Sequence, residues 1–141
     1  LPLLFMKRIE GREDINNIVR KFYGQVRENE ILGPVFTNAI PAGEWDRHME
    51  KITDFWDSAI FGSMTFKGNP ATSHVNLDKN NDYKITQDHF SIWLNQWSET
   101  INEDYEGEIA ENMKMRARKM ATGLYLGMWH HKPDDLKPSL D

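Results

Sequence analysis

The sequence contains no cysteine among its 141 residues. This absence excludes disulfide bonds, thiolate nucleophiles, iron–sulfur clusters and cysteine-ligated zinc sites, so any metal ion must be held by His, carboxylate or Tyr side chains. Long hydrophobic runs are also missing, because the apolar opening at residues 1–6 is too short to cross a membrane. This opening has neither a basic leader nor a small-residue cleavage site, so we expect a cytoplasmic protein with no membrane partner.

Positive charge is scarce and scattered. The chain has 17 Lys and Arg against 22 Asp and Glu, which gives a net charge of −5. A nucleic-acid partner would require a basic stripe or patch, so none is predicted. Aromatic residues, in contrast, are abundant, with five Trp, four Tyr and seven Phe, and they predict one well-packed domain rather than a disordered chain.

No segment alternates polar and apolar residues over a useful length, whereas apolar residues recur at three- and four-residue spacing nearly throughout. The sequence therefore predicts an all-α fold. Four long helices are expected at about 12–31, ending at Leu32-Gly33-Pro34, and at about 44–61, 87–101 and 105–130, with Val35-Phe36 crossing into a turn and Thr86 as an N-cap.

The expected organisation is an N-terminal extension at 1–11, one helical domain at 12–130 and a C-terminal tail at 131–141. Residues 1–5 are left out of the fold prediction, because Met6-Lys7-Arg8 resembles a natural start. Between the second and third long helices, Gly62, Gly68 and Pro70 break the helical pattern, so residues 70–77 are expected to form at most a short helix. A connection this long is unusual in a plain helix bundle, and a buried cofactor would give it a surface to pack on.

The candidate site residues are individually ordinary. His74 lies in the short segment 70–77, where a lone histidine is more often a surface residue than a ligand. His48 lies on the apolar face of its predicted helix, where a histidine is more often a hydrogen-bonded core residue. Tyr23, His48 and Trp93 nevertheless come from three helices, and each offers a hydrogen-bond donor from an apolar wall. Such donors stabilise a small ligand with partial negative charge, and His74 could supply the single strong ligand that haem iron needs.

Five groups of residues, in this order along the chain, resemble the truncated haemoglobins and within them the third group. They are Phe22-Tyr23; Leu32-Gly33-Pro34-Val35-Phe36 with Asn38-Ala39-Ile40; Trp45-Asp46-Arg47-His48 with Phe55-Trp56; Gly68-Asn69-Pro70 leading to His74-Val75-Asn76-Leu77; and Phe90-Ser91-Ile92-Trp93-Leu94. The resemblance covers about residues 12–129. It implies an abbreviated globin fold, in which a two-on-two helical sandwich encloses one haem b, and it makes 12–130 the globin-like haem domain.

The same resemblance implies a role for each candidate. His74 would be the proximal ligand of the iron, and Tyr23, His48 and Trp93 would be the distal polar residues. The implied apolar haem contacts are Phe36, Ile52 and Phe55. His48 and Trp93 would also contact the haem itself.

The implied function is binding of a diatomic gas at ferrous iron, with dioxygen, nitric oxide or carbon monoxide as the ligand and oxygen transport as one use. One alternative is a haem enzyme, peroxidase-like or similar to a nitric oxide dioxygenase, that uses the same donors. It would need an external reductase, because the sequence supplies no reductase domain. A second alternative is a haem-free helical interaction module, in which the aromatic stripes are only core.

The connection after His74 is longer than the family pattern leads us to expect, so the orientation of His74 is the feature that the sequence leaves open. This connection begins like an EF-hand loop, with Asp78, Asn80 and Asp82 at alternate positions. Tyr83 then takes the position of the required glycine and His89 that of the bidentate glutamate, so no calcium site is predicted.

Overall fold

The computed structural model describes residues 6–140, so residues 1–5 of the expected extension lie outside it. The described chain forms six α-helices, two short 3-10 helices and no β-strand, which confirms the all-α prediction. The helices are α1 (Arg12–Glu28), α2 (Leu32–Ala39), α3 (Trp45–Phe61), α4 (Pro70–Asn80), α5 (Gln87–Asp104) and α6 (Glu108–His131), with η1 (Ala42–Glu44) before α3 and η2 (Asp134–Leu136) near the end. None of the helices in this part of the chain is long and apolar enough to span a membrane.

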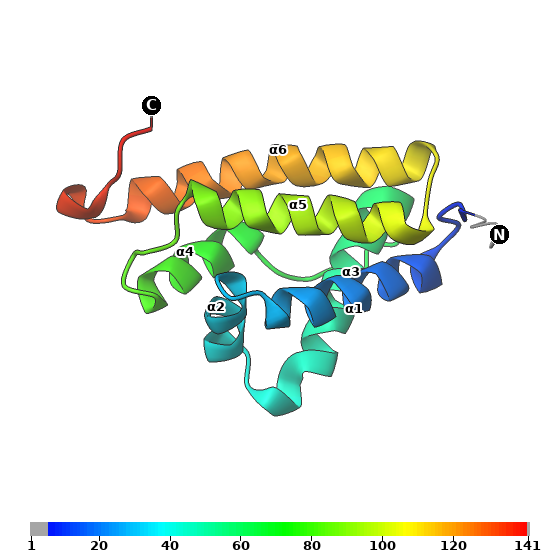
Figure 1. Cartoon of the computed structure of the whole chain (residues 1–141), viewed down its shortest axis with the longest axis horizontal. Helices are drawn as coiled ribbons and strands as arrows, with labels where there is room; N and C mark the ends of the chain where they lie inside the picture. Colours follow the sequence, from blue (N-terminus) through cyan, green and yellow to red (C-terminus); the bar gives the residue numbers. More distant parts are fainter. Residues whose placement is uncertain (1–5, 141) are drawn as a thin grey trace.

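The helices pack as two pairs. α1 lies against α3, α5 lies against α6, and the two pairs meet where α1 packs on α5. Figure 1 shows α5 and α6 side by side along the long axis, with α1 and α3 beneath them. The short helix α4 packs against α6 near its C-terminal end. This is the two-on-two sandwich that the resemblance to truncated haemoglobins implies.

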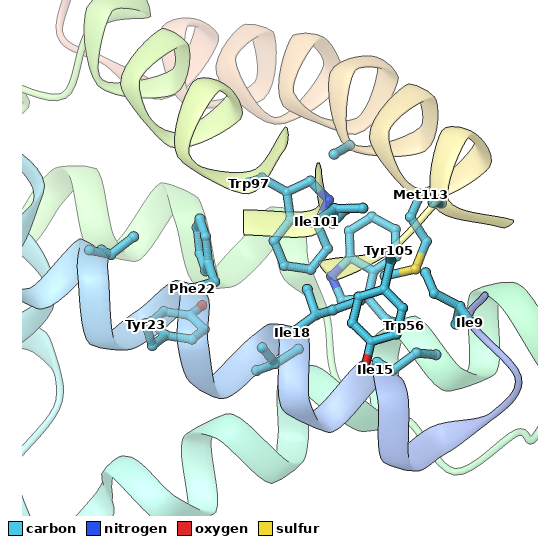
Figure 2. Close-up of a cluster of buried hydrophobic side chains, with 14 of the residues drawn as sticks. Ile9, Ile15, Ile18, Phe22, Tyr23, Trp56, Trp97, Ile101, Tyr105 and Met113 are labelled. Atoms are coloured by element: carbon cyan, nitrogen blue, oxygen red, sulfur yellow. The ribbon is translucent and has the colours of Figure 1, made fainter. Parts of the chain in front are cut away.

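The buried face of α1 follows its apolar spacing. Ile15, Ile18, Val19, Phe22 and Val26 recur every three or four residues, and all are buried. Figure 2 shows this face directed at the side chains of α5 and α6. Burial of one such side chain contributes about 1.5–3 kcal/mol, so this stripe fixes α1 on the sandwich.

Three indoles stack across the interface between the helix pairs. The ring of Trp56 on α3 lies 5.0 Å from that of Trp97 on α5, and the two planes are 22° apart. Trp97 is in turn 6.0 Å from Trp93, one turn earlier on α5, with planes only 7° apart. Phe22 meets Trp97 edge-on at 5.1 Å. Aromatic contacts of this kind add about 0.5–1.5 kcal/mol each beyond the area that they bury.

The first helix ends before Leu32 as predicted, at Glu28, but the stop predicted at Leu32-Gly33-Pro34 and the turn predicted at Val35-Phe36 are wrong. These residues lie in α2, which begins at Leu32. The Asn29 side chain accepts hydrogen bonds from the backbone N–H groups of Ile31 and Leu32, both at 2.9 Å, and so satisfies donors at the start of the helix. Pro34 falls in the first turn, where its missing N–H has no intrahelical partner to lose.

Other boundaries move by a few residues. α4 continues to Asn80, α5 continues through the break predicted near residue 102, and α6 begins at Glu108 after Gly107, whose φ of 107° favours glycine. The division at 11 and 131 stays a prediction. Ile9 and Lys132, which lie just outside the predicted domain, are both buried against it.

Gly33 marks a close approach between α2 and the end of α1. A Cβ atom added at this position would lie 2.7 Å from the Arg27 carbonyl oxygen, whereas one added at Gly24 on α1 would meet nothing within 4 Å. Gly33→Ala should therefore lower the free energy of unfolding by about 1–3 kcal/mol, measured by urea denaturation, because backbone atoms must shift. Gly24→Ala is the matched control and should be neutral or stabilising by up to about 1 kcal/mol. Equal stability of the two variants would show that the close approach is absent.

Candidate functional site

A cavity of about 340 Å³ lies within the helical sandwich, and all six helices contribute to its wall. This volume is typical of small-molecule and cofactor sites. All seven site residues predicted from the sequence line it. They are Tyr23, Phe36, His48, Ile52, Phe55, His74 and Trp93. The structure thus brings them together at one place, and their roles there are a separate question.

His74 is held in one tautomer. Asn69 caps α4 by accepting from the Thr72 N–H at 3.1 Å, and Pro70 occupies the first helical position. The His74 Nδ1 lies 2.6 Å from the Pro70 carbonyl oxygen, which can only accept, so Nδ1 carries the proton. The Nε2 atom therefore keeps its lone pair, as a metal-ligating imidazole does.

The surroundings of His74 keep the ring neutral. Burial lowers its pKa from the usual value, and the hydrogen bond to Pro70 opposes this shift only in part. Phe90 from α5 lies along one side of the imidazole, with ring centroids 6.3 Å apart and planes 28° apart. A neutral, oriented imidazole in an apolar wall is suited to bind a metal.

His48 and Tyr23 form a second polar group in the wall. Their rings meet edge-on, with centroids 5.1 Å apart. Burial, together with the nearby charge of Lys51, lowers the pKa of His48 to about 4, so His48 is neutral at pH 7. Its Nε2 atom is buried and has no hydrogen-bond partner among the described residues. An unpaired buried polar atom costs about 1–3 kcal/mol, and a bound group that pairs with it would recover this cost.

Tyr23 and Trp93 bring further donors to the cavity. Tyr23 is only 4% exposed, and burial raises its pKa, so its hydroxyl stays protonated and can donate. Its ring is held edge-on by Phe36 and by Trp45, each with centroids 5.7 Å away. Trp93 is fixed by its stack on Trp97. These donors are held by packing before any ligand arrives.

Two further side chains of the wall, one cationic and one a hydrogen-bond donor, were not predicted from the sequence. Lys51 lies three residues after His48, so the helical period places it beside His48 on α3. The His89 Nδ1 accepts a hydrogen bond from the Thr86 N–H at 3.1 Å, and the proton of the neutral ring is therefore on Nε2. The capping spacing from Thr86 to His89 was the signal available in the sequence.

The charge of the wall is one-sided. Within residues 6–140 no Asp or Glu lines the cavity, although acidic residues exceed basic ones in the whole chain. The exposed cluster Arg116, Arg118 and Lys119 does not reach the wall. The site therefore suits an apolar ligand that carries carboxylates and a metal. Haem has this chemistry, and the orphaned His48 Nε2 and the lone pair on the His74 Nε2 fit it.

Comparison with known proteins agrees with this geometry. The sequence model of the family described as "Bacterial-like globin" matches residues 4–124. The group 3 truncated hemoglobin ctb of Campylobacter jejuni is 33% identical over 114 residues, which cover 79% of this chain and 86% of that protein. The crystal structure of the group III truncated hemoglobin from Campylobacter jejuni superposes with a TM-score of 0.80 at 28% identity, and the match covers 92% of this chain and 99% of that one.

The family match spans most of the chain, and the fold match extends over nearly all of it. Globins as a family bind haem, which agrees with the chemistry of the cavity wall. The chain therefore belongs to the bacterial-like globin family, among its group III truncated haemoglobins.

Proposed function

We propose that this chain binds haem b in the cavity, with His74 as the proximal ligand of the iron, and that it binds a diatomic gas. The observation that carries the proposal is the imidazole of His74, whose proton is held on Nδ1 by the Pro70 carbonyl while Nε2 remains a lone-pair donor. When bound, ferrous haem supplies the iron that coordinates the gas. The residues around the cavity would hold the haem, and they would orient and shield the bound gas.

Three side chains would act on the gas ligand. Tyr23 donates its hydroxyl proton, and Trp93 offers its indole N–H, which can only donate. His48 is neutral and can place either a donor or an acceptor at Nε2, depending on its tautomer. In a dry cavity such donors stabilise partial negative charge on the outer atom of a ligand such as dioxygen, and this slows its escape.

The apolar wall would hold the macrocycle. Phe36, Ile52 and Phe55 provide contact surface from α2 and α3. Lys51 and His89 offer hydrogen-bond donors to its carboxylates. The described part of the wall has no acidic residue, so these carboxylates would meet no repulsion from it.

A haem enzyme is the second candidate, peroxidase-like or acting on nitric oxide with dioxygen. The buried, unpartnered His48 Nε2 beside Tyr23 favours it, because such a pair could move a proton. An external reductase would have to supply electrons. Turnover with a chemical reductant, compared between the wild type and His48→Leu, tests this candidate, and turnover no faster than that of free haem excludes it.

The absorption spectrum tests the main proposal. The purified protein supplied with haemin should show a Soret band, and its ferrous form should show an iron–histidine vibration. His74→Ala should abolish this vibration. His131→Ala is the matched control. The His131 Nδ1 also forms a hydrogen bond with the carbonyl four residues earlier, that of Gly127, at 2.8 Å, but His131 lies on the exposed surface. No Soret band in the wild type, or an unchanged vibration in His74→Ala, would refute the proposal.

Tyr23→Phe tests the distal donors. Loss of a hydrogen bond to a ligand with partial charge costs about 1–3 kcal/mol, so dioxygen should dissociate roughly 5- to 150-fold faster, measured by stopped flow. Carbon monoxide carries less charge and should respond less. Tyr105→Phe is the control, since that hydroxyl bonds Asp14 at 3.1 Å and Tyr105 does not line the cavity. Equal dioxygen rates for the wild type and Tyr23→Phe would contradict the assigned role.

The low pKa of His48 predicts an acid-dependent stability. The unfolded chain takes up a proton near pH 6.5 and the folded chain only near pH 4, so the free energy of unfolding should fall as the pH decreases between these values. His48→Gln should lose less stability than the wild type from pH 7 to pH 4, as measured by melting temperature. The exposed His131→Gln should follow the wild type. Parallel curves for all three proteins would show that His48 titrates normally.

A further inference from the structure

The loop after α4 closes around an internal cation. The Lys132 Nζ atom lies 3.0 and 2.8 Å from the Asp78 carboxylate oxygens, 2.8 Å from the Tyr83 carbonyl and 3.0 Å from the Ile85 carbonyl. The Ile85 N–H completes the arrangement by donating to the Asp78 Oδ1 at 3.1 Å. The Lys132 and Asp78 side chains are 1% and 2% exposed. The ammonium thus finds oxygen partners for all its protons.

Of the three residues at calcium-ligand positions in this loop, the arrangement uses only Asp78. Asp78 points inward to Lys132, whereas Asn80 and Asp82 are exposed. No group of three or more metal-ligating side chains occurs anywhere within residues 6–140. The positive charge that faces Asp78 therefore comes from Lys132 of the chain itself.

The backbone of the loop confirms that it is held under constraint. Asp82 and Tyr83 have φ values of 56° and 59°, in the left-handed region that non-glycine residues rarely adopt. The Tyr83 N–H donates to the Asp78 carbonyl at 2.8 Å, and the Asn81 side chain donates to the Leu77 carbonyl at 2.7 Å. In this unfavourable conformation the Tyr83 carbonyl points at Lys132 and accepts a hydrogen bond from it.

The ion pair sits at the end of the helix that carries His74. Asp78 follows His74 by four residues, so the two lie on the same face of α4, one turn apart. Lys132 directly follows α6, whose Met120, Ala121 and Met128 line the cavity. The pair therefore ties the last turn of the His74 helix to the end of α6, which packs against α4 and also lines the cavity.

We propose that Asp78 and Lys132 are positioning residues for His74: they fix the C-terminal turn of α4 on α6, while Pro70 fixes the imidazole at the other end, and together they set the orientation of the ring toward the cavity. This proposal rests on the proposed function, in which His74 binds haem iron. It assigns the additional loop residues a role in holding the cofactor. Partners that orient a metal-binding histidine change metal affinity by about 10- to 100-fold.

The test compares Lys132→Met with the double variant Asp78→Asn/Lys132→Met, each loaded with haem. The single variant leaves a buried carboxylate unpaired and should lose stability, whereas the double variant has no unpaired charge and should keep its fold. Both variants lose the tether. Ile101→Ala is the control, because it opens the core at a fully buried residue that does not line the cavity.

Two readouts separate positioning from stability: the frequency of the iron–histidine vibration in the ferrous protein and the rate of haem transfer to an excess of an acceptor apoprotein. We expect a shifted vibration and about 10- to 100-fold faster haem loss in the double variant despite a melting temperature near that of the wild type. Ile101→Ala should have a lower melting temperature than the wild type and an unshifted iron–histidine vibration.

An unshifted vibration and unchanged haem loss in the double variant would overturn the positioning role and leave the haem proposal standing. The same shift in Ile101→Ala would overturn it too, because general loosening would then suffice. If the wild type shows no Soret band, the haem proposal fails first and the positioning role falls with it.

Discussion

The stacked indoles of Trp56, Trp97 and Trp93 are the constraint on which the rest of the structure depends. Trp97, in the middle of the stack, packs in the core with Phe22, Ile18 and Ile101. Trp56 and Trp93, which flank it, line the cavity. A protein interior normally closes every void, so a cavity persists only where rigid groups hold its wall apart. Flat rings locked against one another meet this requirement.

The rigid wall keeps polar atoms directed into the cavity. Tyr23 is held edge-on by four aromatic rings, those of Phe22, Phe36, Trp45 and His48. The ring cannot turn away from the cavity. Beside it, the His48 Nε2 has no hydrogen-bond partner among the described residues. The fold thus holds a polar atom that a bound ligand could satisfy, which is a common property of binding sites.

The long helices could be predicted from the sequence because their apolar stripes are periodic. α2 was missed because its signal is a capping side chain, Asn29, followed by a proline that reads equally well as a stop. The length of α4 was underestimated for another reason. Its last turn depends on Lys132, which lies 54 residues further along the chain in a segment predicted to be a tail. No local pattern reports a partner at that distance.

The candidate site was predicted in the same uneven way. Spacing placed His48 and Trp93 on apolar faces, and the resemblance to truncated haemoglobins selected His74 from among the histidines of the chain. The structure brings all these residues to one cavity, while their ligand contacts remain proposals. Lys51, His89 and Phe90 were not selected because a wall residue is defined by what it faces, and a single sequence does not contain that information.

The late position of Lys132 also orders events during synthesis. When Asp78 is added to the growing chain, its partner is still 54 residues from being added. At about 5–20 residues per second this delay is roughly 3 to 11 s. During that interval the His74 helix exists without its tether, and α6, which completes the wall, is still being made. A cofactor bound as proposed would therefore meet a complete pocket only after α6 and Lys132 have been added, so the order of these segments in the chain delays its loading.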